Sequence, residues 1–186
     1  MAEQDSAHNV EIELKARIQN REDVESRLAK CMRPMGKVDK RDEYWEVSSR
    51  DPLHPGTFRF RVRKEPGHTT ITFKDKSFDG DLEINREFEF GIDNEAVFKI
   101  FVERLQGRFV YRKHKIGTRW ESETGIVAEV VEVAPLGLFL EVECVCNTQD
   151  ALAQEEAKCQ LYDVLEWCGI PRRALEPRPY SQLLGY

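Results

Sequence analysis

Charged and apolar residues alternate in a short segment near the start of the sequence. Glu11, Glu13 and Lys15 would share one face of a β-strand, and Ile12 and Leu14 the other, because successive side chains of a strand point to opposite sides. Carboxylate oxygens are the ligands that hard divalent cations prefer, and a lysine binds phosphate oxygens. A single solvent-exposed strand has the same pattern, so the interpretation depends on whether other strands repeat it.

Other predicted strands do repeat the pattern. Basic residues share one face of the predicted strands at 57–65 and 69–76, and acidic residues share one face at 82–90 and 138–144. These residues are Arg59, Arg61, Arg63 and Lys74, and Glu87, Glu89, Glu141 and Glu143. A metal alone would not need the arginines, and a phosphate alone would not tolerate so many carboxylates. Both together favour a polyphosphate that carries a divalent cation.

The remaining segments predict an α+β chain. Apolar spacing indicates three helices and further strands, namely helices at about 21–35, 94–106 and 149–168 and strands at about 40–47, 109–115, 117–123 and 126–133. Short connections favour antiparallel neighbours. With one charged face on so many strands, we expect an eight-stranded antiparallel β-barrel, a tunnel with a polar lumen, flanked by about three helices. The second helix is predicted to turn Val97, Ile100, Phe101, Arg104 and Leu105 inward.

Length and charge limit the classes of function. The 186 residues suit a single domain over 1–186, and a net charge of −6 gives no basic excess for a nucleic acid or an anionic membrane. No apolar run reaches the roughly 18 residues of a membrane span, and the polar start lacks a signal-peptide core. Five cysteines without zinc-finger spacing are typical of reduced thiols. We therefore expect a cytoplasmic protein.

The charged segments resemble, in order, those of the CYTH family, the triphosphate tunnel metalloenzymes, which include class IV adenylate cyclases, thiamine triphosphatases and inorganic triphosphatases. EIELK resembles the family's Glu-x-Glu-x-Lys signature. DEYW, FRFRVR, TFK, REFEF and KHK resemble its Asp-x-Tyr, Arg-x-Arg, Thr-x-Lys, Arg-x-Glu and Lys-x-Arg strands. LGLFLEVE resembles its Leu-Gly-x-Phe-x-Glu-x-Glu hairpin, and PRPYSQLLGY its C-terminal segment. The resemblance covers essentially the whole chain.

The resemblance implies a role for each charged position. The predicted ligands of Mg²⁺ or Mn²⁺ are Glu11, Glu13, Glu132, Glu141 and Glu143. The residues predicted to bind phosphate directly or to orient the basic groups are Lys15, Arg59, Arg61, Arg63, Lys74, Lys113, Lys115, Glu87 and Glu89. Lys15, Arg59 and Glu132 are the candidates for direct catalytic roles.

The sequence departs from the family pattern at two positions. Val131 stands where an aspartate is usual before the Leu-Gly turn, and either Glu132 or Glu129 could replace that ligand if the hairpin is shortened or bulged. Lys115 stands where an arginine is common, which keeps the charge but loses the bidentate fork.

Three functions stay open from the sequence. The first is metal-dependent hydrolysis of tripolyphosphate, a nucleoside triphosphate or another organic triphosphate. The second is a class IV adenylate cyclase, which converts ATP to cyclic AMP and pyrophosphate. The third is a module that binds polyphosphate or nucleotide without cleaving it. The partner in each case is a small molecule that bears a triphosphate, and the resemblance is compatible with a homodimer.

Overall fold

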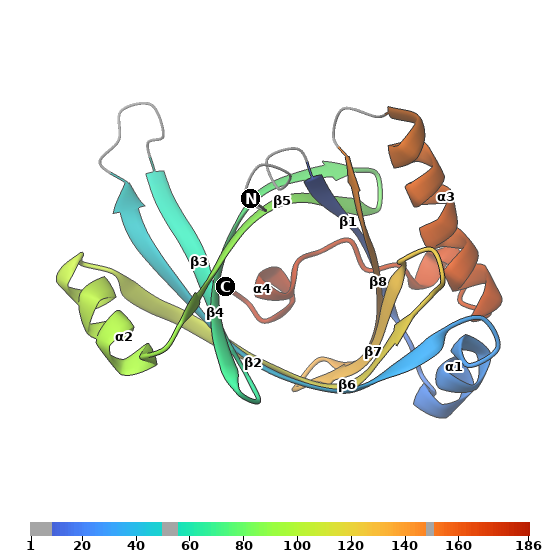
Figure 1. Cartoon of the computed structure of the whole chain (residues 1–186), viewed down its shortest axis with the longest axis horizontal. Coiled ribbons are helices and arrows are strands. Elements are labelled where there is room, and N and C mark those ends of the chain that lie inside the picture. Colours follow the sequence, from blue (N-terminus) through green and yellow to red (C-terminus); the bar gives the residue numbers. More distant parts are fainter. Residues whose placement is uncertain (1–8, 50–55, 148–150) are drawn as a thin grey trace.

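The structure, a computed structural model, describes residues 9–49, 56–147 and 151–186. In these ranges, eight antiparallel strands close into a barrel in the order β1-β5-β4-β3-β2-β6-β7-β8 (Figure 1). The strands are β1 (Asn9–Arg17), β2 (Arg33–Ser49), β3 (Gly56–Glu65), β4 (His68–Asp79), β5 (Leu82–Ile92), β6 (Arg108–Glu121), β7 (Val127–Val133) and β8 (Gly137–Asn147). The predicted α+β tunnel is confirmed.

Helices cover parts of the outside of the barrel (Figure 1). They are α1 (Arg21–Leu28), α2 (Glu95–Arg104) and α3 (Ala151–Trp167). The 3₁₀-helix η2 (Arg172–Ala174) and the short helix α4 (Tyr180–Leu183), which does not lie on the outside, follow α3 in the chain. Ile12 and Leu14 of β1 pack in one buried cluster with Leu161 and Val164 of α3 and Leu28 of α1. This packing turns the apolar face of β1 outward, so its charged face points into the lumen.

Two predicted strands, at 109–115 and 117–123, form the single strand β6. Gly117 is not a break in it. A Cβ atom at this position would collide with the backbone carbonyl oxygen of Val130 on β7. The glycine therefore permits the close approach of β6 and β7, a role that glycine has inside strands.

The first predicted helix is shorter than expected, and the strand after it is longer. α1 begins after its cap Asn20, whose side chain accepts from the backbone N–H of Asp23 at 3.2 Å, and it ends at Leu28. Pro34 and Gly36 belong to β2, where the register with β6 shifts between them. A proline is tolerated at such a bulge, because the ladder already lacks a regular hydrogen bond there.

The predicted inward face of α2 is wrong. Phe98 and Val102 contact the barrel, whereas Val97, Ile100, Phe101 and Leu105 are all more than half exposed. Lys99 pairs at 2.6 Å with Glu43 on the outer face of β2 and with Glu95 one turn earlier. The ion pair and the Phe98 contact together set the rotation of the helix about its axis. The apolar spacing of the helix alone did not predict this rotation.

The C-terminal segment enters the barrel. In Figure 1, α4 lies inside the ring of strands. Tyr180 packs there against Val131, Val133 and Phe139, so one part of the lumen is apolar. The backbone N–H of Glu176 donates to the Lys15 carbonyl oxygen at 2.7 Å and joins the segment to β1. In the described residues, no helix has the length and apolar character needed to span a membrane.

Candidate functional site

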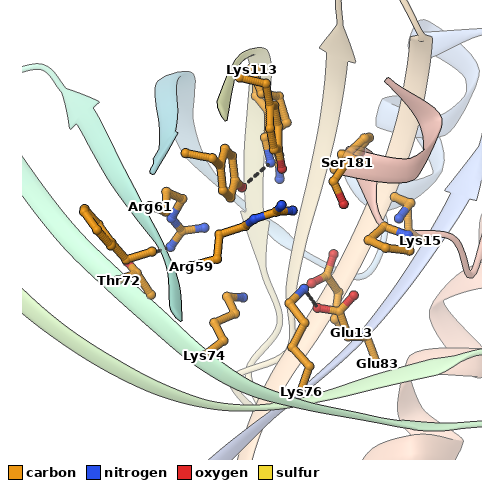
Figure 2. Close-up of a pocket in the computed structure, with 16 residues that line it drawn as sticks. Glu13, Lys15, Arg59, Arg61, Thr72, Lys74, Lys76, Glu83, Lys113 and Ser181 are labelled. Atoms are coloured by element: carbon orange, nitrogen blue, oxygen red, sulfur yellow. Dashed lines mark hydrogen bonds and ion pairs between the residues drawn. The ribbon is translucent and has the colours of Figure 1, made fainter. Parts of the chain in front are cut away.

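The lumen holds two polar spaces. A cavity of about 280 Å³ is lined by Glu13, Lys15, Tyr44, Arg59, Phe60, Arg61, Thr72, Lys74, Lys76, Glu83, Tyr111, Lys113, Lys115, Pro179, Tyr180 and Ser181. Figure 2 shows that Lys15 and Ser181 face Arg59 and Arg61 across it. A second space of about 180 Å³ is lined by Glu11, Glu13, Lys40, Arg61, Arg63, Lys74, Glu87, Glu89, Lys115, Arg119, Glu129, Glu141 and Glu143. Every predicted site residue except Glu132 therefore lines the lumen, although their roles stay predictions.

Glu132 does not belong to the site. It is exposed, whereas Glu129 is buried and faces the lumen. The β7–β8 register pairs Glu129 with Glu141 and Glu132 with Leu138, so Glu132 lies on the outer side of the barrel. Of the two candidates for the missing carboxylate, the structure places Glu129 in the lumen. Val131 shares that face and packs against Tyr180 instead of supplying a ligand.

Several luminal carboxylates are neutralised by basic neighbours. Asp42 accepts a bidentate pair from Arg63, at 2.8 and 3.0 Å, and lies 3.3 Å from the Lys113 ammonium. Burial raises the pKa of Asp42, but Lys113 and Arg63 outweigh it and hold that pKa well below its usual value. The charge of Asp42 is thus compensated, and Asp42 orients basic side chains.

Glu87, Glu129 and Glu141 are compensated in the same way. Lys74 pairs with Glu87, Lys115 with Glu141, and Lys40 with Glu129 at 2.5 Å. Burial raises the pKa of Glu141, but the Lys115 and Lys113 charges outweigh it and hold the pKa at about 2. The other oxygen of Glu141 accepts from the Tyr180 hydroxyl at 2.6 Å. For Glu141 to bind a metal, one of these contacts would have to open.

Glu11, Glu13 and Glu143 form the part of the acidic cluster that lacks close compensation. Among the described residues, the nearest cation contacts are 3.5 Å for Glu11, to Lys74, and 3.7 Å for Glu143, to Arg119. Glu13 and Glu143 are directly opposed on β1 and β8, an arrangement that like charges destabilise. Burial, reinforced by neighbouring carboxylates, raises the pKa of Glu13, and it raises that of Glu11 to about 9 and of Glu143 to about 7.

This subset fits a hard divalent cation. Its donors are carboxylate oxygens, which Mg²⁺ and Mn²⁺ prefer, and a cation would remove the repulsion between them. Within the described residues, no three such side chains already converge as an assembled metal site. The donor chemistry therefore supports Glu11, Glu13 and Glu143 as ligands, with side-chain movement required on binding.

The basic side chains gather around one ring. The ammonium groups of Lys15, Lys113 and Lys115 lie 4.5, 4.7 and 5.4 Å from the centroid of Tyr180. Burial lowers the pKa of Lys15, and Glu13 and Glu141 partly offset this. The neighbouring Arg61 donates to the Thr72 hydroxyl at 2.9 Å, while its buried Nε atom has no partner among the described residues. Lys113, Lys115 and Arg61 also contact the carboxylates of Asp42, Glu141 and Glu89. Lys15 has no ion pair among the described residues and donates to the Arg178 carbonyl oxygen at 2.7 Å. Such a gathering of basic side chains suits phosphate binding.

Some lumen residues were missed from the sequence. Lys40 and Arg119 bind Glu129 at 2.5 and 2.9 Å. Lys40 has the strand parity of Asp42 in the DEYW segment, and Arg119 has that of the predicted Lys113, so this signal could have found them. Asn85, which the sequence places on the charged face of its strand but without a site role, is fully buried and pairs in register with Glu11. Tyr111, which stacks on Tyr44 at 4.3 Å, follows the parity of Lys113 and was also overlooked.

The protein is a closed eight-stranded tunnel with basic and acidic side chains in its lumen. Comparison with known proteins finds the same fold. No family model matches the chain. A candidate adenylate cyclase of Methanocaldococcus jannaschii is 24% identical over 177 residues, which are 95% of this chain and 99% of that protein.

Solved structures share the fold. A protein of Pyrococcus horikoshii superposes with a TM-score of 0.77 at 24% identity, over 94% of this chain and 97% of that one. A candidate adenylate cyclase of Vibrio parahaemolyticus gives 0.73 at 15% identity, over 95% and 98%. A candidate adenylyl cyclase of Hippeastrum, described as having a dominant triphosphatase activity, gives 0.62 at 14%, over 95% and 93%. These neighbours share the tunnel fold over nearly the whole chain, and their names are consistent with the resemblance to the CYTH family.

Proposed function

We propose that the protein is a divalent-metal-dependent enzyme that binds a triphosphate in the tunnel and hydrolyses it. One observation carries the proposal. Seven basic side chains line the larger cavity, namely Lys15, Arg59, Arg61, Lys74, Lys76, Lys113 and Lys115, next to the poorly compensated carboxylates. A triphosphate with its cation would neutralise both groups at once.

The residues divide the chemistry between them. Arg61 and Arg59 would bind phosphate oxygens and stabilise the charge that develops on them, while Lys15 and Lys113 would align the chain of phosphates. Glu11, Glu13 and Glu143 would hold the metal, which, when bound, polarises a phosphoryl oxygen or orients the attacking water. Asp42 and Glu87 would hold the basic side chains in place. The chain's contribution is therefore mainly positioning and electrostatic stabilisation.

Cyclisation of ATP is the second candidate, because similar proteins are named candidate adenylate cyclases. The activity described for the Hippeastrum protein favours hydrolysis. A module that binds without cleaving is the third candidate, because Val131 supplies no ligand and the luminal Glu129 is already paired with Lys40 and Arg119.

Product identification separates the candidates. The purified protein is incubated with ATP or tripolyphosphate and Mg²⁺ or Mn²⁺, and the products are quantified. Orthophosphate supports the hydrolase, and cyclic AMP with pyrophosphate supports the cyclase. Tight binding without any turnover leaves the non-catalytic module.

A matched pair of arginine variants tests the tunnel as the site. Arg61→Met should lower kcat/KM at least a hundredfold, because it removes a buried fork from the cavity. Arg112→Met on the outer face, where the side chain is 73% exposed, should change it less than twofold. Equal effects of the two substitutions would place the reaction elsewhere.

A further inference from the structure

Three aromatic rings form a continuous stack beside the phosphate-binding cations. Tyr44 and Tyr111 are parallel, with ring centroids 4.3 Å apart and an angle of 8° between their planes. Tyr186 lies on Tyr111, with centroids 4.9 Å apart and an angle of 14°. Tyr44 and Tyr111 line the larger cavity, and Lys113 donates to the Tyr44 hydroxyl at 3.2 Å. The stack therefore begins where the phosphate site ends.

The outer ring of the stack belongs to the C-terminal segment. Tyr186 is 59% exposed, whereas Tyr111 below it is buried at 4%. The backbone N–H of Tyr186 donates to the Ser181 carbonyl oxygen at 2.8 Å, and that of Leu184 donates to Tyr180 at 2.9 Å. These bonds fix Tyr186 relative to Tyr180. One short segment thus places one ring among the lysines and another on the aromatic stack.

We propose that the face of Tyr111 is a stacking subsite for the planar base of a nucleoside triphosphate, and that Tyr186 competes for it. Parallel rings at this separation are the geometry in which a nucleobase stacks on an aromatic side chain. A nucleotide with its phosphates among Lys15, Lys113 and Arg61 would have its base near the stack. This inference rests on the proposed function and adds a determinant of which triphosphate is preferred.

The two kinds of substrate should respond differently to Tyr186. Tripolyphosphate has no planar group, so it does not need the Tyr111 face. A nucleotide gains that contact only when Tyr186 leaves. Tyr186 stacks on Tyr111 and is absent from the residues that line either luminal space. It can therefore be changed without altering the phosphate or metal residues.

The test compares KM values for ATP and tripolyphosphate in the full-length protein with Mg²⁺. Tyr186→Ala should lower KM for ATP about tenfold, in the range of one base–aromatic stack, and leave KM for tripolyphosphate within twofold. Tyr186→Phe keeps the ring and should behave like the wild type for both. A KM for ATP that is unchanged or raised in Tyr186→Ala, or an equal shift for both substrates, overturns the inference.

Calorimetry separates this inference from the proposed function. Tripolyphosphate and an ATP analogue with a β,γ-imido bridge are titrated into the wild type and Tyr186→Ala in the presence of Mg²⁺. Tighter binding of the analogue alone in Tyr186→Ala supports the subsite even if neither substrate is cleaved. If tripolyphosphate binds but Tyr186→Ala does not tighten binding of the analogue, the stacking subsite is wrong and the triphosphate site stands. If neither compound binds, both proposals fail.

Discussion

Luminal carboxylates differ in whether a nearby cation already compensates their charge, and this difference indicates the role of each one. Asp42, Glu129 and Glu141 have close basic partners and lowered pKa values, so they act as holders of lysine and arginine. Glu11 and Glu143 have raised pKa values, because burial and neighbouring carboxylates disfavour their charge. Both groups consist of carboxylates whose side chains face the lumen. Only the cross-strand neighbours separate a structural carboxylate from a candidate metal ligand.

Replacing a poorly compensated carboxylate should stabilise the metal-free protein. The raised pKa of Glu11 means that its charge opposes folding increasingly as the pH rises above about 4.3. Glu11→Gln should therefore increase the free energy of unfolding at pH 8 by about 1 kcal/mol and abolish the rise in Tm on adding Mn²⁺. Urea denaturation and thermal melts measure both. The exposed control Glu132→Gln should alter neither, and a lower stability of Glu11→Gln would contradict the assignment.

Replacing a compensated carboxylate should do the opposite. Asp42→Asn leaves the buried Arg63 and Lys113 without their counter-charge and should cost about 3–5 kcal/mol at pH 7. Because the pKa of Asp42 is depressed in the folded state, its contribution is complete above the unfolded pKa of about 3.9 and is lost as the pH falls through the lower folded value. The stabilities of the wild type and Asp42→Asn should thus begin to converge as the pH falls below about 3.9, and they should become equal only below the folded pKa of Asp42. Urea denaturation across this pH range checks it, and a difference that persists at the lowest pH would disprove it.

At the scale of elements, close approach between strands matters as much as their pattern. β6 and β7 come together at Gly117, where side-chain volume is excluded by backbone atoms of Val130 and Val131. β7 carries Glu129, and β6 carries Lys113 and Lys115. The spacing of these two strands therefore determines how their charged side chains meet in the lumen.

Gly117→Ala should force β6 and β7 apart. The added methyl group meets backbone, which cannot rotate away, so we expect a loss of about 3 kcal/mol or more in the free energy of unfolding. Gly91→Ala in β5 is the matched control, because its nearest heavy atom would lie 4.0 Å from the new Cβ, and its stability should change by less than about 1 kcal/mol. Chemical denaturation of both variants measures the two changes in the free energy of unfolding. Equal losses would mean that any strand glycine is required.

The sequence predicted the strands and their charged faces because a period of two is visible without tertiary structure. It could not choose between Glu129 and Glu132, because the register of the β7–β8 hairpin depends on the turn. The rotation of α2 depended on Lys99 and on the distant Glu43. The stack of Tyr44, Tyr111 and Tyr186 arises only when the C-terminal segment enters the barrel.

At the scale of the whole molecule, the lumen and the exterior have different electrostatic characters. The chain carries a net charge of −6, yet basic side chains outnumber acidic ones around the larger cavity. An anionic ligand would thus be attracted by the local field of the cavity, even though the protein as a whole repels it. The absence of a nucleic-acid partner and the homodimer stay predictions.

Closure of the barrel also bears on how the protein folds. β1 pairs along its length with β8, so Lys15 meets Glu141 only after nearly all other strands have been made. Contacts this distant in sequence carry a large loop-closure cost and slow the search for the native state. Until α3 has also been made, the apolar face of β1 lacks part of its cover. During synthesis on the ribosome, β1 is therefore among the first strands made, and the edge that pairs with β8 is among the last to find its partner, which exposes that edge to mispairing with other chains.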